Sequence, residues 1–201
     1  MKGGDASGSG AMGGVANYNV NGELTYVQIA DGIEYIADGE TLMIDNLHTD
    51  AVDDAEDMNI VGVRVMMSYG EDESGRGPPC LSQTAADTIT GSATHGEFTG
   101  SADGQNGGQN GGHDVVVEWF NSSMVGATVS GLSESEIVSQ IDSMGAGLGA
   151  YSADIGVTAQ ADGCVNPLLP DNEDNGEEVT YSVELIIFDY TIAPAFDESE
   201  L

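Results

Sequence analysis

The stretch Val-Gly-Val-Arg-Val-Met-Met-Ser-Tyr, residues 61–69, decides the fold of this chain. Apolar side chains occupy every second position of the stretch, so they share one face of an extended strand. The opposite face is mixed, because Arg64 and Ser68 flank the apolar Met66. A strand that is apolar on one side and partly covered on the other is typical of the centre of a sheet in two packed layers.

Two later stretches repeat this period-two pattern. Residues 115–119 place two valines and a tryptophan on one face, and residues 181–187 carry Tyr, Val, Leu and Ile at alternate positions. Weaker strand patterns lie at residues 84–93 and 95–101, and a further strand is predicted at residues 151–160. We therefore expect an all-β fold, an antiparallel β-sandwich of jelly-roll or immunoglobulin-like type with one short α-helix.

Dipeptides that favour tight turns punctuate the N-terminal part of the chain. Asn21-Gly22, Asp31-Gly32 and Asp38-Gly39 each combine a residue that tolerates positive φ with a glycine. We expect short strands between them. The strongest hairpin signal is Asn21-Gly22, which lies between residues 17–20 and residues 23–30.

One helix is predicted in the second half of the chain. Ser133 and Glu136 have the spacing of a capping box, which satisfies the free N–H groups of a first helical turn. Ile137, Ile141 and Met144 then follow at helical spacing. We expect this helix to cover one open end of the sandwich.

The length of the chain indicates one domain. A chain of 201 residues buries enough surface for a hydrophobic core. Residues 1–14 are rich in Gly and Ser and predict a flexible lead, whereas residues 193–201 form an acidic tail. We assign residues 15–192 to a single β domain.

The charge balance is extreme. The chain has 35 Asp and Glu residues but only three basic side chains, Lys2, Arg64 and Arg76, so its formal net charge is −32. Salt screening or bound divalent cations must relieve the repulsion, and both adaptation to a saline medium and specific cation binding explain the composition. The negative field excludes nucleic acid and anionic membrane surfaces as partners, and the sequence has no segment suited to membrane insertion.

The two cysteines, Cys80 and Cys164, lie in turn-rich sequence. Neither has an adjacent basic residue to activate a thiol, and two cysteines with three scattered histidines make a poor zinc site. We expect a disulfide that closes a loop of about 85 residues and stabilises the fold by roughly 4–5 kcal/mol, with two unrelated thiols as the alternative. A disulfide indicates an extracellular or cell-surface location. Residues 1–14 show no export signal, so we expect a soluble part of a longer exported protein or a start that lies upstream.

An acidic run near the C-terminus has the alternating oxygen ligands of a calcium loop. Gly176 fits the sharp glycine turn of such loops, but Ser182 stands where a bidentate Glu is expected, so a nearer Glu must substitute. The acidic loop of residues 48–57 is a second calcium candidate, and a solvated loop is the alternative for both. The ligands expected at the first site are Asp171, Glu173, Asn175 and Glu177.

The sequence carries no recognisable catalytic constellation. It has no Gly-x-Ser-x-Gly motif, and we expect His48, His95 and His113 to be surface residues. Asn121-Ser122-Ser123 is a glycosylation sequon, which makes Asn121 a candidate site for glycan attachment.

These features predict an extracytoplasmic structural, adhesive or assembly module without catalytic activity, whose partners are other surface proteins or glycans. The alternative is a calcium-stabilised carbohydrate-binding module. That alternative requires an exposed aromatic platform, for which Trp119, Tyr151 and Tyr190 are the candidates. A virion or filament subunit is also compatible with the sequence.

Overall fold

The computed structural model describes residues 14–70, 87–105, 111–160 and 174–195, which form nine β-strands and one α-helix. The helix α1 spans Glu134–Ile141, and short 3-10 turns lie at η1 (Thr49–Ala51), η2 (Ala55–Asp57) and η3 (Ser122–Met124). The expectation of a mostly β chain with one helix is confirmed for these residues. The strands are β1 (Ala16–Ala37), β2 (Thr41–His48), β3 (Ile60–Tyr69), β4 (Thr88–His95), β5 (Phe98–Gln105), β6 (Gly111–Glu118), β7 (Thr128–Leu132), β8 (Ala150–Thr158) and β9 (Gly176–Pro194).

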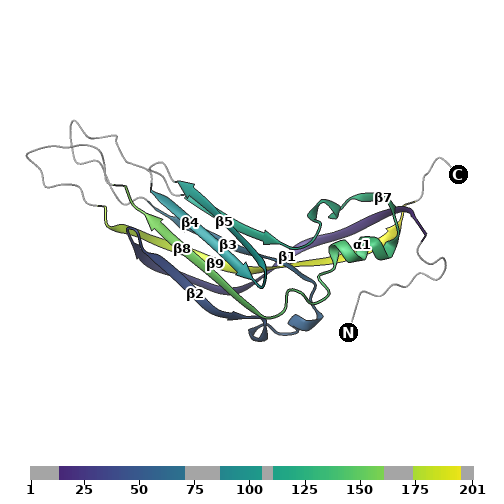
Figure 1. The fold of residues 1–201 in the computed structure, drawn as a ribbon, viewed down its shortest axis with the longest axis horizontal. Helices are drawn as coiled ribbons and strands as arrows, with labels where there is room; N and C mark the ends of the chain where they lie inside the picture. The colour runs from purple at the N-terminus through teal and green to yellow at the C-terminus, as the bar shows by residue number, and fades with distance from the viewer. Residues whose placement is uncertain (1–13, 71–86, 106–110, 161–173, 196–201) are drawn as a thin grey trace, which may run out of the picture.

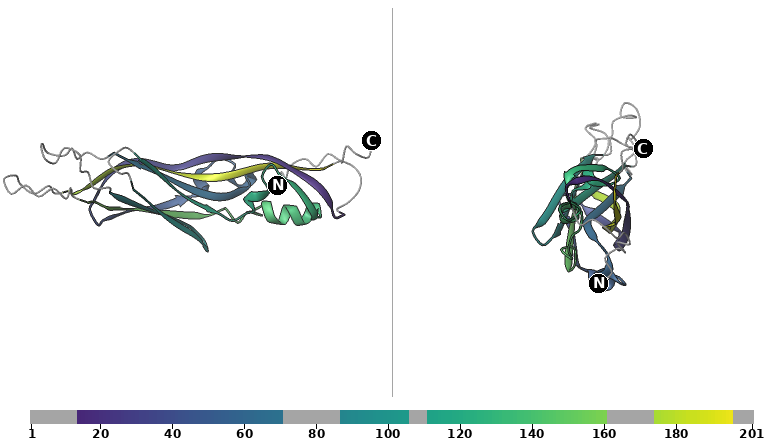
Figure 2. Two further views of the ribbon diagram at one scale, coloured as in Figure 1. Left: turned by 90° about the horizontal axis from the view of Figure 1, so that it is seen from above. Right: turned by 90° about the vertical axis from the view of Figure 1, so that its right-hand side faces the viewer.

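The strands form two antiparallel sheets. One has five strands in the order β6-β3-β9-β1-β7, and the other has four in the order β2-β8-β4-β5. β1 and β9 pair along most of their length and follow the long axis of an elongated molecule (Figure 1 and Figure 2). The four-stranded sheet lies toward one end of this pair, and α1 and β7 lie at the other end (Figure 1). Among the helices of the described residues, none is long and apolar enough to cross a membrane.

The three stretches with the period-two pattern pair edge to edge. Val65 of β3 lies opposite both Val115 of β6 and Val183 of β9. Residues directly opposite each other in a sheet point to the same face, so the aliphatic sides of the three strands share one interior. The expectation that the three stretches are strands is confirmed, and the structure places them side by side in the order β6-β3-β9.

Consecutive residues of β9 belong to two different hydrophobic clusters. Val183, Leu185 and Ile187 point into the main core, which lies between the two sheets. Ile186 and Phe188 point to the opposite face of β9, into a second cluster that we term the end core. Side chains from α1, β7 and η3 cover the end core. Burial on both faces explains why β9 is apolar at consecutive positions.

The helix begins as predicted. Ser133 is the N-cap, its hydroxyl accepts from the Glu136 N–H, and the Glu136 carboxylate accepts from the Ser133 N–H. This reciprocal pair is the expected capping box. Ile137 and Ile141 are completely buried in the end core, so α1 packs on one face of the five-stranded sheet.

The helix ends earlier than its apolar spacing predicts. α1 stops at Ile141, and Met144 has a φ of 51° and a side chain that is 72% exposed, so its predicted packing on the helix is wrong. The Asn59 side chain explains this end, because its Nδ2 donates to the Ile141 carbonyl and its Oδ1 accepts from the Ser143 N–H. These bonds satisfy polar groups that a continued helix would have paired.

β1 contradicts the predicted hairpin at Asn21-Gly22. The strand runs unbroken through Asn21-Gly22 and Asp31-Gly32, so both predicted turns are wrong, whereas Asp38-Gly39 does form a turn with φ 75° at the glycine. A Cβ on Gly22 would lie 2.3 Å from the Asp189 carbonyl oxygen, and one on Gly32 would lie 2.7 Å from the Tyr181 hydroxyl. The two glycines therefore permit the close approach of β9 rather than a reversal of the chain.

Candidate metal centre

Three carboxylates meet at one end of the main core. They belong to Asp87, Asp174 and Glu177, and each offers an oxygen such that these oxygens all lie within 4.8 Å of one another. Asp87 directly precedes β4 of the four-stranded sheet, whereas Asp174 and Glu177 lie at the start of β9 in the five-stranded sheet. The cluster therefore joins the two sheets.

Asp87 is the most enclosed member of the cluster. Its side chain is fully buried, and its Oδ1 accepts a 2.8 Å hydrogen bond from the backbone N–H of Gln160, which follows β8. Its carbonyl oxygen accepts a 2.8 Å bond from the Tyr69 hydroxyl at the end of β3. The first bond orients the carboxylate of Asp87, and the second holds its backbone against the end of β3.

Gly176 directs Glu177 into the cluster. Its φ is 132°, a conformation that favours glycine, and a Cβ there would lie 2.1 Å from the Ile36 carbonyl oxygen of β1. The Gly176 N–H donates to Asp174 Oδ1 at 3.2 Å. Glu177 pairs with Ile36 and is only 2% exposed, so the bend at Gly176 brings two acidic side chains together.

The donor set suits a hard cation. Carboxylate oxygens are the ligands that Ca²⁺ and Mg²⁺ prefer, whereas zinc sites use nitrogen and sulfur more often. Bringing three carboxylates together away from water is costly unless positive charge accompanies them. The cluster can hold a metal ion.

The predicted calcium ligands are only partly brought together. Glu177 belongs to the cluster, Asn175 is exposed, and Asp171 and Glu173 lie outside the described residues. Asp174 was missed although it belongs to the same acidic run. Asp87 was missed because it stands alone at a strand start, where no sequence pattern distinguishes it from other acidic residues.

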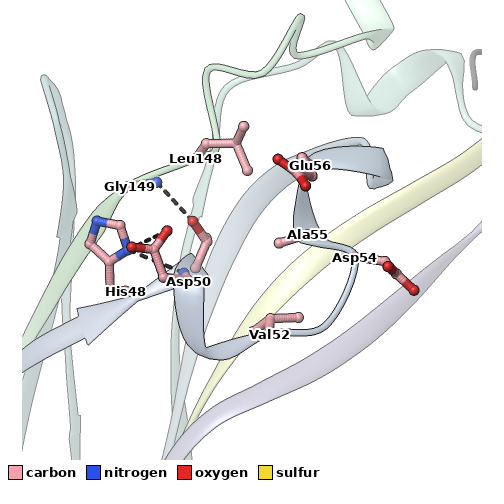
Figure 3. Close-up of a pocket in the computed structure, with 9 residues that line it drawn as sticks. His48, Asp50, Val52, Asp54, Ala55, Glu56, Leu148 and Gly149 are labelled. Atoms are coloured by element: carbon pink, nitrogen blue, oxygen red, sulfur yellow. Dashed lines mark hydrogen bonds and ion pairs between the residues drawn. The ribbon is translucent and has the colours of Figure 1, made fainter. Parts of the chain in front are cut away.

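The second acidic loop borders a pocket of about 530 Å³. Figure 3 shows Asp50 beside His48, with the Asp54 carboxylate directed away from that pair. His48 Nδ1 accepts a 3.1 Å hydrogen bond from the Asp50 N–H. Among the described residues, the only group of three or more metal-ligating side chains that converges is the one at Asp87, so this loop does not form a comparable site. The pocket is lined by His48, Thr49, Asp50, Val52, Asp54, Ala55, Glu56, Leu148 and Gly149.

The predicted disulfide and the predicted glycosylation site have different outcomes. Cys80 and Cys164 lie outside the described residues, so the disulfide stays a prediction. Asn121 is half-buried, and its Nδ2, the atom that would carry a glycan, donates to Gln140 Oε1 at 3.0 Å. Glycosylation there would require this bond to break.

The three histidines do not share one environment. His48 is exposed as expected, and His113 is half-buried. His95 is only 6% exposed, so its predicted surface position is wrong. The ring fills a space between Tyr151 and Trp119, two residues that are remote from it in sequence.

The aromatic residues proposed for sugar binding are mostly covered. Tyr151 is buried, and Trp119 and Tyr190 are half-buried. Burial raises the pKa of Tyr151; burial, together with a hydrogen bond to Asp142, raises that of Tyr190. The tyrosines that are exposed in the described residues are Tyr26 and Tyr35 of β1.

Comparison with known proteins gives no family for this chain. Neither a protein-family model nor a curated protein sequence matches it. Its function must therefore be argued from its own residues.

Proposed function

We propose that this chain is an extracytoplasmic structural, adhesive or assembly module, built as a β-sandwich and stabilised by a calcium ion. The observation that supports the proposal most directly is a set of exposed apolar side chains on the face of the five-stranded sheet opposite the main core, in the part of that face that the end core leaves uncovered. We term this face the outer face; its exposed apolar residues are Tyr26, Ile33, Tyr35 and Val116.

The strand register places these residues on one side of the sheet. Val116 lies opposite Arg64, which lies opposite Glu184. Ile33 and Tyr35 pair with residues of β9 that are separated from Glu184 by even numbers of positions, so they share its face. The main core lies on the other side. Ile33 is 62% exposed and Tyr35 is 59% exposed, and they lie two positions apart on β1, so these two side chains form an exposed apolar pair of the kind that suits a contact surface.

The scaffold behind the outer face supports a structural role. The β1–β9 pair links the main core to the end core, so one antiparallel strand pair connects the two ends of the molecule (Figure 2). A surface presented on paired strands is more rigid than one presented on loops. Such a scaffold suits contact with other surface proteins.

The assembly proposal is tested by sedimentation of the protein at high salt, where repulsion between copies is screened. The double variant Ile33→Ser, Tyr35→Ser is expected to weaken self-association or partner binding. Met43→Ser is the matched control, because Met43 is 69% exposed on β2 of the other sheet. Equal behaviour of the two variants and the parent would reject the outer face as the contact surface.

Carbohydrate binding is the second candidate function. The exposed rings of Tyr26 and Tyr35 favour it, since aromatic faces on a sheet can stack on sugars, although the Arg64 guanidinium already lies 3.8 Å from the Tyr26 ring centre. A glycan array probed with calcium present separates the candidates. Binding that Tyr35→Ser abolishes supports this function, and an array without signal rejects it.

Calcium is the ion proposed for the carboxylate cluster, because Ca²⁺ accepts several carboxylates in flexible geometry. An ion that binds only the folded state stabilises it by about 2.7 kcal/mol at 100 times its Kd, a rise in Tm of roughly 5–11 °C at this chain length. Thermal melting with calcium and with chelator measures the shift. Glu177→Gln should abolish it, whereas Glu178→Gln, at the exposed neighbouring position, should retain it.

The calcium experiment also has a competing outcome. Lys2 and Arg76 lie outside the described residues, and a basic side chain is the chemical alternative to a metal ion. If the parent shows no calcium shift while Arg76→Gln lowers the Tm more than Arg64→Gln does, the compensating charge belongs to Arg76 and the calcium site is rejected.

A further inference from the structure

His95 has an unusual pair of hydrogen-bond partners. Its Nδ1 lies 2.9 Å from the Ala150 carbonyl oxygen, and its Nε2 lies 2.6 Å from the Ala146 carbonyl oxygen. Both partners are backbone carbonyls, which can only accept hydrogen bonds. The ring is almost completely enclosed, so water is not a ready substitute for either partner.

This geometry has a direct consequence for the proton count of the ring. A neutral imidazole has one N–H donor and one acceptor nitrogen, so one of the two short contacts would join two acceptors. A doubly protonated imidazolium donates at both positions. We infer that His95 is held as a buried imidazolium that fastens the segment of residues 142–149, between α1 and β8, to the four-stranded sheet, and that loss of its proton releases this segment.

The surroundings of the ring favour a positive charge. The ring stacks on Tyr151 with centroids 4.1 Å apart and an interplanar angle of 14°, and the Trp119 ring lies 5.1 Å away. Aromatic faces attract cations, and charge-assisted hydrogen bonds are stronger than neutral ones. The net charge of the chain, −32, adds a general attraction for a proton. These contributions oppose the cost of removing the cation from water.

The other titratable groups near the ring do not bond to it. Tyr151 stacks on the ring from β8, and its hydroxyl donates to the Gly147 carbonyl. Glu97 in the β4–β5 turn, Glu118 before Trp119, and His48 opposite Ala150 are all exposed. Among the described residues, none forms an ion pair with His95. The two carbonyls and the aromatic rings therefore determine the charge state.

The fastened segment forms one wall of the pocket in Figure 3. Leu148 and Gly149 line that pocket, and the Gly149 N–H donates to Thr49 Oγ1 at 2.9 Å across it. Removing one ring proton would eliminate one hydrogen bond and leave a nitrogen lone pair against a carbonyl oxygen. The segment of residues 142–149 would then detach from His95 more often. The attachment of this segment therefore depends on pH in the range where histidine titrates, roughly pH 5 to 8.

The charge state is tested by NMR of the full chain with ¹⁵N-labelled histidine. The long-range ¹H–¹⁵N spectrum reports whether each ring nitrogen carries a proton. We expect both ring nitrogens of His95 to carry a proton in the folded protein, because each faces a backbone carbonyl. A spectrum in which one of the two nitrogens lacks a proton at every pH where the chain is folded would overturn the inference, and this measurement needs no variant.

The fastening role is tested by hydrogen exchange of the Leu148 and Gly149 amides, corrected for their intrinsic rates. Their protection should fall about tenfold as the His95 ring loses its proton. His95→Gln cannot titrate and should show low protection at every pH, while His48→Gln should follow the parent. Protection that stays constant in the parent while the ring deprotonates would overturn the inference.

Discussion

At the level of single residues, glycines in β1 make room for the neighbouring strand. A Cβ on Gly22 would meet backbone and the Phe188 ring of β9, at 2.3 Å from the Asp189 oxygen and 2.8 Å from the ring. Backbone atoms in the middle of a sheet cannot yield as the end of a flexible side chain can. The absence of a side chain at Gly22 is thus a packing requirement.

Gly22→Ala is therefore expected to destabilise the protein by about 1–3 kcal/mol, the usual cost of an overpacked contact. Urea unfolding measures the difference. Gly14→Ala is the matched control, since a Cβ there has no atom within 4 Å, and its effect should be within about 0.5 kcal/mol. An alanine tolerated equally well at both positions would show that β1 and β9 are farther apart than the pairing indicates.

At the level of elements, the capping box is the clearest local determinant of α1. Hydrogen bonds from the Ser133 backbone and hydroxyl lower the pKa of Glu136 below its ordinary value of 4.5. The ionised carboxylate thus stabilises the folded state above that ordinary value. This contribution is lost as the pH falls through the lower value of the folded state.

Ser133→Ala is expected to cost about 1 kcal/mol at pH 7, the typical loss for an N-cap residue. The cost should become smaller in acid, because Glu136 is then protonated in both proteins. Urea unfolding of parent and variant at neutral and acidic pH measures the difference in their free energies of unfolding. Protonation of the other carboxylates affects both proteins equally, so it cancels in this difference. A cost that grows as the pH falls would contradict the assignment.

Elements with a local signal could be predicted from the sequence. β3, β6 and β9 show period-two patterns because they are neighbours in one sheet and each buries one face in the main core. The start of α1 could be predicted because its capping box lies within four consecutive residues. β1 could not be predicted as one strand, because its glycines are explained only by β9, at the far end of the chain. A dipeptide such as Asn21-Gly22 has the same local conformational preference whether it forms a hairpin turn or lies inside a strand against a neighbouring strand.

The candidate site follows the same logic. Glu177 could be predicted from an acidic run with a glycine, but Asp87 reaches it only because β4 and β9 belong to sheets that pack together. His95 was misjudged for a similar reason, since the rings and carbonyls around it come from β8, the segment before it and Trp119. Contacts between residues that are distant in sequence produce no periodic pattern, so the sequence alone does not predict them.

At the level of the whole molecule, the net charge of −32 dominates the response to solution conditions. Self-repulsion favours the expanded unfolded chain, and salt reduces it, since the screening length falls from about 10 Å at 0.1 M to about 3 Å at 1 M. The free energy of unfolding in calcium-free buffer should rise as salt is added.

Thermal melting in sodium chloride and in choline chloride at equal ionic strength checks this expectation. Similar curves would assign the rise to screening, which does not depend on the identity of the cation. A rise confined to sodium would instead indicate specific cation binding. A Tm that falls with both salts would show that the carboxylates do not destabilise the folded state.

The position of β9 between β3 and β1 also constrains the order of events during synthesis. The ribosome delivers β1 and β3 early, but neither can gain its central neighbour until residues 176–194 have emerged. Until then Val61 and Val20, both fully enclosed in the finished protein, lack Ile186 and Phe188, the β9 side chains that pack with them in the end core. Contacts between such distant segments form slowly, so a nascent chain stalled before its last strand is an incomplete sheet with open edges, and a natural client for a chaperone.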